Sequence, residues 1–276
     1  MDSSEPEERG EQEALEVVPE RLPQTLEHRL KQHTPARVGL GRVGHAPPLL
    51  AALEFQLAHA EARDAVWKTP DWAALERGIL ALDTGALGGQ VLRLKSRAAD
   101  RAQYLLRPDL GRRLHPESRA RLENVGSGNC DVALVLADGL SGAALDAQVL
   151  SVLGALLPLL EGRGHSVAPL VLVQDARVAL GDEVGEVLGA KTVIVLIGER
   201  PGLSSADSLG LYLTHTPKVG RTDAERNCIS NVQAQGICAL EAAKKLLSLL
   251  EGARKLGRSG VDLKPLEEGM GGKLEP

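Results

Sequence analysis

The stretch Thr192-Val-Ile-Val-Leu-Ile-Gly198 decides the fold class, and the residues Glu199-Arg200-Pro201-Gly202 follow it directly. Its seven residues carry no charge, and five of them are β-branched. A short apolar run of this composition indicates a strand that is buried on both faces, as in a parallel sheet. Open α/β sheets place their ligands at the carboxyl ends of such strands, so the charged pair Glu199-Arg200 follows the strand where a ligand is expected.

The residues before this strand repeat a regular alternation of strand and helix. The pattern predicts strands at Val132–Ala137 and Val167–Val173, and helices at Leu145–Leu160 and Gly181–Leu188. This alternation favours parallel pairing with right-handed crossovers. We therefore predict an α/β protein with a mostly parallel, Rossmann-like open sheet and flanking helices, preceded by a smaller helical N-terminal region.

The segments after the central strand are less regular. Leu209–Leu213 indicates a further edge strand, and residues 221–231 read as a polar loop that carries one thiol. A final helix is predicted from Leu240 to Leu256, with an apolar stripe along one side, and Gly257 is placed to end it.

Four segments describe the expected domain organisation. Residues 1–30 form a flexible acidic tail, and 31–125 form a mainly helical N-terminal region with one short strand at Val91–Lys95. Residues 126–264 form the Rossmann-like domain, which begins near the glycines at 126 and 128, and 265–276 form a second flexible tail. Both tails lack the apolar periodicity that a packed element needs.

Composition argues against several classes of protein. The net charge is −5 with both signs interspersed, which provides no basic face for a nucleic acid. The N-terminus has no apolar signal segment, and the apolar run Val149–Leu160 is too short and interrupted to span a bilayer. The cysteines form no CxxC pair, which favours a reducing compartment and a cytoplasmic location; they are Cys130, Cys228 and Cys238.

A glycine-rich motif, Gly39-Leu-Gly-Arg-Val-Gly44, fits the spacing of a dinucleotide fingerprint. Its context does not fit, because Pro47 and Pro48 follow where the helix should already have started. Pro48 suits the first position of a helix, so a loop before a helix at about 48–66 is favoured. The weaker alternative is an independent nucleotide-dependent oxidoreductase.

Three acidic residues follow predicted strands and are expected at one rim of the sheet: Asp138, Asp175 and Glu199. They indicate either a metal site or a rim that binds amide groups, while Asp138 alone is equally well explained as a helix N-cap. The arginine-rich segment Arg97–Arg113 indicates a solvated ion-pair face or a partner surface.

No catalytic motif is found in the sequence: it has no nucleophile elbow, no phosphate-binding loop and no metal-binding Cys/His spacing. Cys228 has only His215 nearby in sequence as a base, which disfavours a nucleophilic role. An α/β chain of this kind suggests a binding subunit, with a non-catalytic scaffold as the alternative.

Several motifs, in order, resemble one family. They are "GRVG", "FQLAHAEARDAV", "SRAADRAQYLLRPDLGRRL", "ADGLS", "VIVLIGERPGLSSADSLGLYL", "RTDAERNCISNVQAQG" and "EAAKKLLSLLEGARKLGRSGVDLK", which together extend over about residues 36–264. They are similar to the small (light) subunit of ethanolamine ammonia-lyase. That resemblance implies an adenosylcobalamin-dependent radical enzyme that converts ethanolamine to acetaldehyde and ammonia. It also implies a hetero-oligomer in which a large subunit holds ethanolamine and this chain helps to bind the cofactor.

The resemblance implies three cofactor-binding residues, Val178, Glu199 and Cys228, and assigns no catalytic or metal-binding residue to this chain. A carboxylate such as Glu199 suits the amide groups on the rim of a corrin ring. Because the D-x-H-x-x-G signature of base replacement by histidine is absent, the cofactor is expected to keep its own base.

Two features depart from the family pattern. The resemblance implies a second location, a bacterial microcompartment, reached through an amphipathic N-terminal helix, but the first 20 residues here are acidic and weakly apolar. Val43 stands where the family pattern has alanine, and the sequence offers no explanation for this change.

Overall fold

The structure is a computed structural model that describes residues 26–34, 36–82, 85, 87, 89–126 and 128–263. Residues 1–25 of the predicted acidic tail, and the whole predicted tail 265–276, lie outside the described residues. The chain divides into two compact units after Ala52, and each is described by itself.

The first unit contains α1 (Leu26–Lys31), the glycine-rich motif and the start of α2 (Leu49–Trp67). Gly39, Gly41 and Gly44 all have positive φ, and residues 36–42 form no strand that leads into the motif. Helix α2 starts at Leu49, so Pro48 lies directly before the helix and not at its first position as predicted; its carbonyl accepts the Ala52 amide at 3.1 Å. The motif is therefore a loop before a helix, and it lacks the strand that a dinucleotide fingerprint requires.

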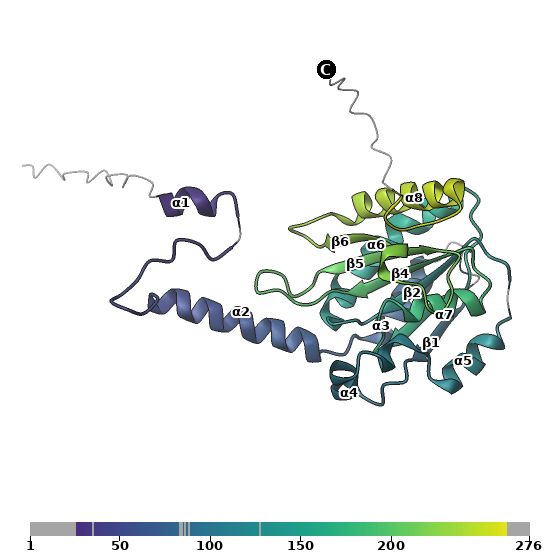
Figure 1. The fold of residues 1–276 in the computed structure, drawn as a ribbon, viewed down its shortest axis with the longest axis horizontal. Helices are drawn as coiled ribbons and strands as arrows, with labels where there is room; N and C mark the ends of the chain where they lie inside the picture. Colours follow the sequence, from purple (N-terminus) through teal and green to yellow (C-terminus); the bar gives the residue numbers. More distant parts are fainter. Residues whose placement is uncertain are drawn as a thin grey trace, which may run out of the picture. The chain divides into compact units, whose positions relative to one another are not determined.

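The second unit is built around a six-stranded sheet in the order β1-β3-β2-β4-β5-β6 (Figure 1). The predicted α/β class is confirmed, but the sheet is mixed: the first three pairings are parallel and the last two antiparallel. The strands are β1 (Val91–Lys95), β2 (Val132–Ala137), β3 (Leu170–Gln174), β4 (Thr192–Gly198), β5 (Leu209–His215) and β6 (Asn227–Val232).

Short connections explain the antiparallel half of the sheet. Residues 199–208 and 216–226 contain no α-helix, whereas a return in the parallel sense needs a crossover that is usually helical. The predicted edge strand at Leu209–Leu213 is therefore an internal strand, and β6 forms the edge. The predicted polar loop 221–231 is also wrong, because it contains the 3-10 helix η2 (Asp223–Glu225) and most of β6.

Helices cover both faces of the sheet, and side-chain size differs between the faces. In β2, Leu134 and Leu136 pack in the cluster that includes α3 (Trp72–Leu82), α6 (Gly142–Gly162) and α8 (Ala239–Leu256). The intervening Ala133 and Val135 pack in a second cluster. That cluster includes residues of α5 (Pro116–Glu123) and α7 (Leu180–Val187). Both faces of β2 are thus buried, which explains its continuous apolar sequence.

Helix α6 is the core helix of the first cluster. It starts at Gly142, three residues before the predicted start, because Ser141 caps it by accepting a hydrogen bond from the Ala144 amide at 3.2 Å. By length and composition α6 alone among the described helices could cross a membrane, although core helices pass the same test. Its buried residues run from Gly142 to Leu160 along the helix, which is what packing against the sheet requires.

Gly198 explains why the decisive strand ends where it does. A Cβ at this position would lie 2.1 Å from the Ser141 carbonyl oxygen and 2.5 Å from that of Asp138. The Gly198 carbonyl in turn accepts a hydrogen bond from the Leu140 amide at 3.0 Å. The carboxyl ends of β2 and β4 therefore meet backbone to backbone, and the charged residues that follow lie at the rim of the sheet.

Candidate functional site

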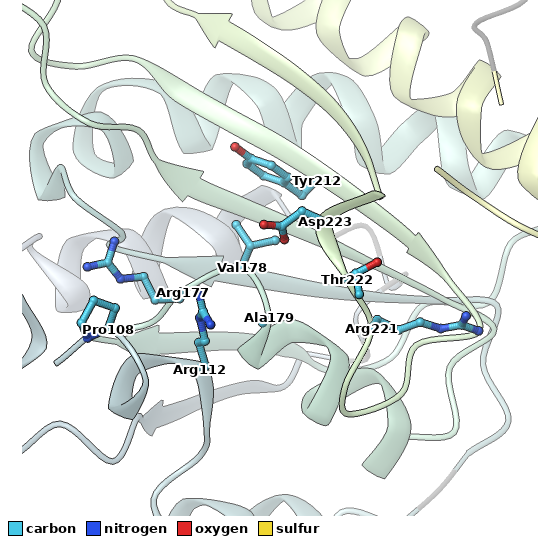
Figure 2. Close-up of a pocket in the computed structure, with 9 residues that line it drawn as sticks. All are labelled: Pro108, Arg112, Arg177, Val178, Ala179, Tyr212, Arg221, Thr222 and Asp223. Atoms are coloured by element: carbon cyan, nitrogen blue, oxygen red, sulfur yellow. The ribbon is translucent and has the colours of Figure 1, made fainter. Parts of the chain in front are cut away.

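Two cavities adjoin at the carboxyl ends of the parallel strands. The first, which we call the rim cavity, has a volume of about 400 Å³ and is lined by Tyr104, Gly139, Leu140, Arg177, Val178, Ile197, Gly198, Glu199, Arg200 and Tyr212. The second, which we call the arginine cavity, has a volume of about 480 Å³. Figure 2 shows its lining residues, which are Pro108, Arg112, Arg177, Val178, Ala179, Tyr212, Arg221, Thr222 and Asp223. Arg177, Val178 and Tyr212 line both, so the two cavities lie next to each other around these three residues.

Val178 lies in the turn between β3 and α7, where it is half-buried. The turn is fixed at both ends: the Arg177 amide donates to the Gly111 carbonyl at 2.8 Å, and the Gly181 amide donates to the Val178 carbonyl at 2.9 Å. The side chain of Val178 reaches both cavities and offers each an apolar wall.

Glu199 follows β4 directly and is half-buried. Its Oε2 accepts hydrogen bonds from the Ser208 hydroxyl at 2.6 Å and from the Asn231 amide at 3.2 Å. Among the described residues no hydrogen bond to Oε1 is found. The carboxylate is therefore held in place through Oε2, while Oε1 lies beside Gly210, where an added Cβ would be 3.0 Å from it.

Cys228 lies on the edge strand β6, directly across from Tyr212 in the antiparallel register. The residue is exposed, and partial desolvation raises the pKa of its thiol, as does the negative charge of Glu199. A thiol with a raised pKa is neutral near pH 7, so it is a weak hydrogen-bond donor and a poor nucleophile.

The structure thus brings two of the three predicted residues, Val178 and Glu199, into one cavity. Cys228 lines neither cavity, but its strand partner Tyr212 lines both. Burial raises the pKa of Tyr212, and its hydrogen bond with Cys228 acts in the same direction. Tyr212 is accordingly a neutral phenol. It lines the same cavity as Val178 and Glu199 and lies across from Cys228 in the sheet.

The acidic rim divides into two parts. Asp138 and Asp175 both face Nη1 of Arg101, at 3.4 Å and 3.3 Å, and this nitrogen also donates to the Gly139 carbonyl at 2.9 Å. Burial raises the pKa of Asp138 to about 7, Arg101 opposes that shift, and the charge of Asp175 adds to it. Glu199 has its own partners, so the three carboxylates form no common site.

The N-cap interpretation of Asp138 is wrong, because Ser141 caps α6 and Asp138 instead accepts from the Ala176 amide at 3.2 Å. Within the described part of the chain, no group of three His, Cys, Asp or Glu side chains is arranged to hold a metal ion. The side chain that offsets the burial of the Asp138 and Asp175 carboxyl groups is mainly the Arg101 guanidinium.

Sequence reasoning missed Arg101, Tyr104, Arg177 and Tyr212 as site residues. Tyr104 is completely buried, with the guanidinium groups of Arg101 and Arg177 at 4.9 Å and 4.4 Å from its ring centroid. A signal was present, since Arg101 and Tyr104 are three apart and share a face of α4 (Arg101–Leu106). Tyr212 alternates with buried leucines in β5, which places it on the opposite face.

The fold and the cavities define an α/β chain with two neighbouring cavities at the carboxyl ends of its parallel strands, where α/β proteins usually bind their ligands. Comparison with known proteins gives a family for it. Residues 25–264 match the family described as ethanolamine ammonia-lyase light chain (EutC).

Individual relatives agree with that match, and the three described next are all named ethanolamine ammonia-lyase small subunit. The protein of Azotobacter vinelandii is 52% identical over 238 residues, covering 85% of this chain and 86% of the relative. That of Rhodopseudomonas palustris is 52% identical, covering 85% and 88%. The protein of Pseudomonas syringae pv. tomato is 48% identical, covering 85% and 81%.

This chain therefore belongs to the ethanolamine ammonia-lyase light-chain family. Membership makes it a subunit of a lyase, and the words light chain and small subunit imply a larger partner. The resemblance seen in the sequence motifs is confirmed.

Proposed function

We propose that this chain binds adenosylcobalamin together with a large subunit, in a hetero-oligomer that converts ethanolamine to acetaldehyde and ammonia. The observation that carries the proposal is that Val178 and Glu199 line one cavity beside Tyr212. The family resemblance names these two residues, 21 positions apart in the sequence, together with Cys228. Ethanolamine is held mainly by the large subunit.

The residues in the cavity suit a corrin ring. Glu199 offers Oε1 as an acceptor for a side-chain amide of the corrin, while its other oxygen is fixed by Ser208 and Asn231. Val178 and Tyr212 offer apolar surface to the flat ring.

When bound, adenosylcobalamin supplies the radical that begins the reaction. The residues of this chain orient the ring, exclude water from it and leave the chemistry to the cofactor and the large subunit. Neither Glu199 nor Cys228 is assigned a proton transfer.

The sequence left two other functions open. The oxidoreductase alternative rested on the loop Gly39–Gly44, which lacks its strand. A non-catalytic scaffold would have no use for the acceptor at Glu199 beside an open cavity. The family membership and the rim cavity favour the cofactor-binding subunit over both.

Co-expression with a large subunit tests the proposal. We expect the isolated chain to be inactive, and the complex to release ammonia from ethanolamine only when adenosylcobalamin is added. Activity of the isolated chain with a nicotinamide cofactor would contradict the proposal. We further propose a cytoplasmic location, with or without a microcompartment, which fractionation of the source cells would test.

A further inference from the structure

We propose that helix α2 binds one helix of the large subunit along a seam of five residues, and that this partner helix carries a basic side chain opposite Asp64. The seam consists of Leu53, Leu57, Ala60, Asp64 and Trp67. The inference rests on the proposed function, which brings a large subunit to this chain, and extends it from the cofactor to the surface between the subunits.

The seam residues have the spacing of a helix face that packs against another helix. They follow one another at intervals of four, three, four and three residues, which is the spacing of the apolar seam between two paired helices. The seam extends over about 21 Å, because each helical residue adds about 1.5 Å. It can therefore pack against about four turns of one partner helix that crosses at about 20°.

The large apolar side chains of the seam are exposed. Leu53 is 51% exposed, Trp67 54% and Leu57 61%. Single exposed apolar residues are ordinary on a protein surface, but several in line on one helix mark an interaction site. Another face of α2 is already used within the chain, since Ala58 and Ala65 are buried. The helix is thus apolar on two faces, and the described residues cover only one of them.

The C-terminal end of the seam is fixed beside the rim cavity. The Val66 carbonyl accepts a hydrogen bond from Nε of Arg101 at 2.8 Å, and Nη1 of the same arginine donates to the Gly139 carbonyl at 2.9 Å. Gly139 lines the rim cavity. A single guanidinium therefore connects the last turn of α2 to the proposed cofactor surface. A subunit that covers the seam lies next to the cavity that it is proposed to share.

A second copy of this chain does not suit the seam, because Asp64 lies within it. In a parallel pair over the whole seam the two Asp64 carboxylates face each other, and in an antiparallel pair each faces Leu57 of the other copy. Asp64 forms an ion pair with Arg63 at 3.6 Å, but both side chains are exposed and such pairs are weak. Self-pairing therefore buries two poorly compensated carboxylates, which is costly.

Residues 1–25 of the chain do not suit the seam either. They carry eight acidic and two basic side chains, so their net charge repels Asp64 in the seam and Glu54 beside it. An apolar helix with a basic side chain opposite Asp64 complements both the apolar surface and the carboxylate. We assign this helix to the large subunit, because that is the partner implied by the family and because the seam ends beside the cavity proposed to be shared.

The test measures the dissociation constant between the full-length chain and a purified large subunit by analytical ultracentrifugation. The seam variants are Leu53→Ser and Leu57→Ser, and Leu240→Ser is the matched control. Leu240 lies on α8 and is 52% exposed, close to the 51% of Leu53. Because all three substitutions shorten an exposed side chain, the melting temperature of the isolated chain should stay close to wild type in each.

We expect Leu53→Ser and Leu57→Ser each to weaken association with the large subunit by about tenfold or more, since each removes an apolar contact from the middle of the interface. Leu240→Ser should associate like wild type. The two seam variants are independent of each other, so the test survives if one of them impairs folding.

A charge variant tests the basic side chain of the partner. Asp64→Lys should weaken association about tenfold at about 0.1 M salt, and the loss should shrink at about 1 M salt, where the repulsion between like charges is screened. Asp262→Lys, at another exposed position, is the control and should associate like wild type. Wild-type affinity of Asp64→Lys at low salt would overturn the basic side chain opposite Asp64.

Three results would overturn the seam while leaving the proposed function intact. The first is wild-type affinity for the large subunit in both seam variants. The second is an equal loss of affinity in Leu240→Ser. The third is a dimer of the isolated chain that Leu53→Ser abolishes, which would assign the seam to a second copy. If the wild-type chain and the large subunit do not associate, the proposed function itself fails.

Discussion

Arg226 donates two hydrogen bonds to the carboxylate of Asp182, at 2.6 Å and 2.7 Å, and both side chains are almost completely buried. Asp182 lies in the first turn of α7, four residues after Val178, and Arg226 lies two residues before Cys228. The pair therefore ties the turn that carries Val178 to the strand that carries Cys228. Two parts of the candidate site are positioned by one buried contact.

Breaking this pair on one side should be costly. Arg226→Met leaves the Asp182 carboxylate buried without its cation, and we expect the free energy of unfolding to fall by about 3–5 kcal/mol. Urea denaturation monitored by circular dichroism measures this. The double variant Arg226→Met, Asp182→Leu should recover most of the loss, because no charge is then stranded. Arg258→Met breaks an exposed pair with Asp262 and should cost under about 1 kcal/mol. Equal losses in Arg226→Met and Arg258→Met would contradict the role given to the buried pair.

The Asp138 carboxyl should make stability depend on pH. Its pKa is raised to about 7 in the fold, mainly by burial, so the native chain keeps a proton that the unfolded chain loses near pH 4. Between those values the native state binds more protons, and this group makes stability fall as pH rises, by at most about 1.4 kcal/mol per pH unit.

Asp138→Asn removes that titration. The wild-type free energy of unfolding, measured relative to this variant, should decrease between pH 5 and pH 7 and then level off. Asp64→Asn, at an exposed position on α2, is the control. Its free energy of unfolding should depend on pH in the same way as that of wild type. Parallel curves for Asp138→Asn and wild type would show that Asp138 does not titrate in this range.

Gly198 should tolerate no side chain. A Cβ there would collide with two backbone oxygens, which cannot move as a flexible side chain can, so we expect Gly198→Ala to cost at least about 1–3 kcal/mol. At Gly162, which ends α6, a Cβ would have no neighbouring atom within 4 Å. Thermal unfolding should show a lower melting temperature for Gly198→Ala and no loss for Gly162→Ala. A neutral Gly198→Ala would contradict the close approach of β2 and β4.

The buried strands and the last helix could be predicted because their signals are local. The bounds of β2 and β4 match the prediction from their apolar runs, and Gly257 ends α8 with a φ of 72°. Edge strand β6 was missed because its sequence, Asn-Cys-Ile-Ser-Asn-Val, is mostly polar and only Ile229 and Val232 are buried. The composition of an exposed edge strand resembles that of a loop.

The candidate site was only partly predictable. Glu199 directly follows a strand, so its position at the rim could be inferred from the apolar run, whereas Val178 was given only by the family resemblance. Arg101 could not be placed in this way, because its partners Asp138 and Asp175 are 37 and 74 residues away in the sequence. The segment Arg97–Arg113 was predicted as a solvated ion-pair face or a partner surface. Arg107 and Asp109 do form an exposed ion pair, but Arg101 is largely buried against Asp138 and Asp175. Such contacts depend on the tertiary fold, which composition does not specify.

The affinity of the reconstituted complex for cobalamin tests the central claim most directly. We compare wild type with Glu199→Ala and with Glu61→Ala, which removes an exposed carboxylate from α2. Equilibrium dialysis should show weaker binding for Glu199→Ala by about 1–3 kcal/mol, because a buried amide of the ligand loses its acceptor. Glu61→Ala should bind like wild type. Equal cobalamin affinities in the two variants would contradict the assignment of Glu199 to the cofactor.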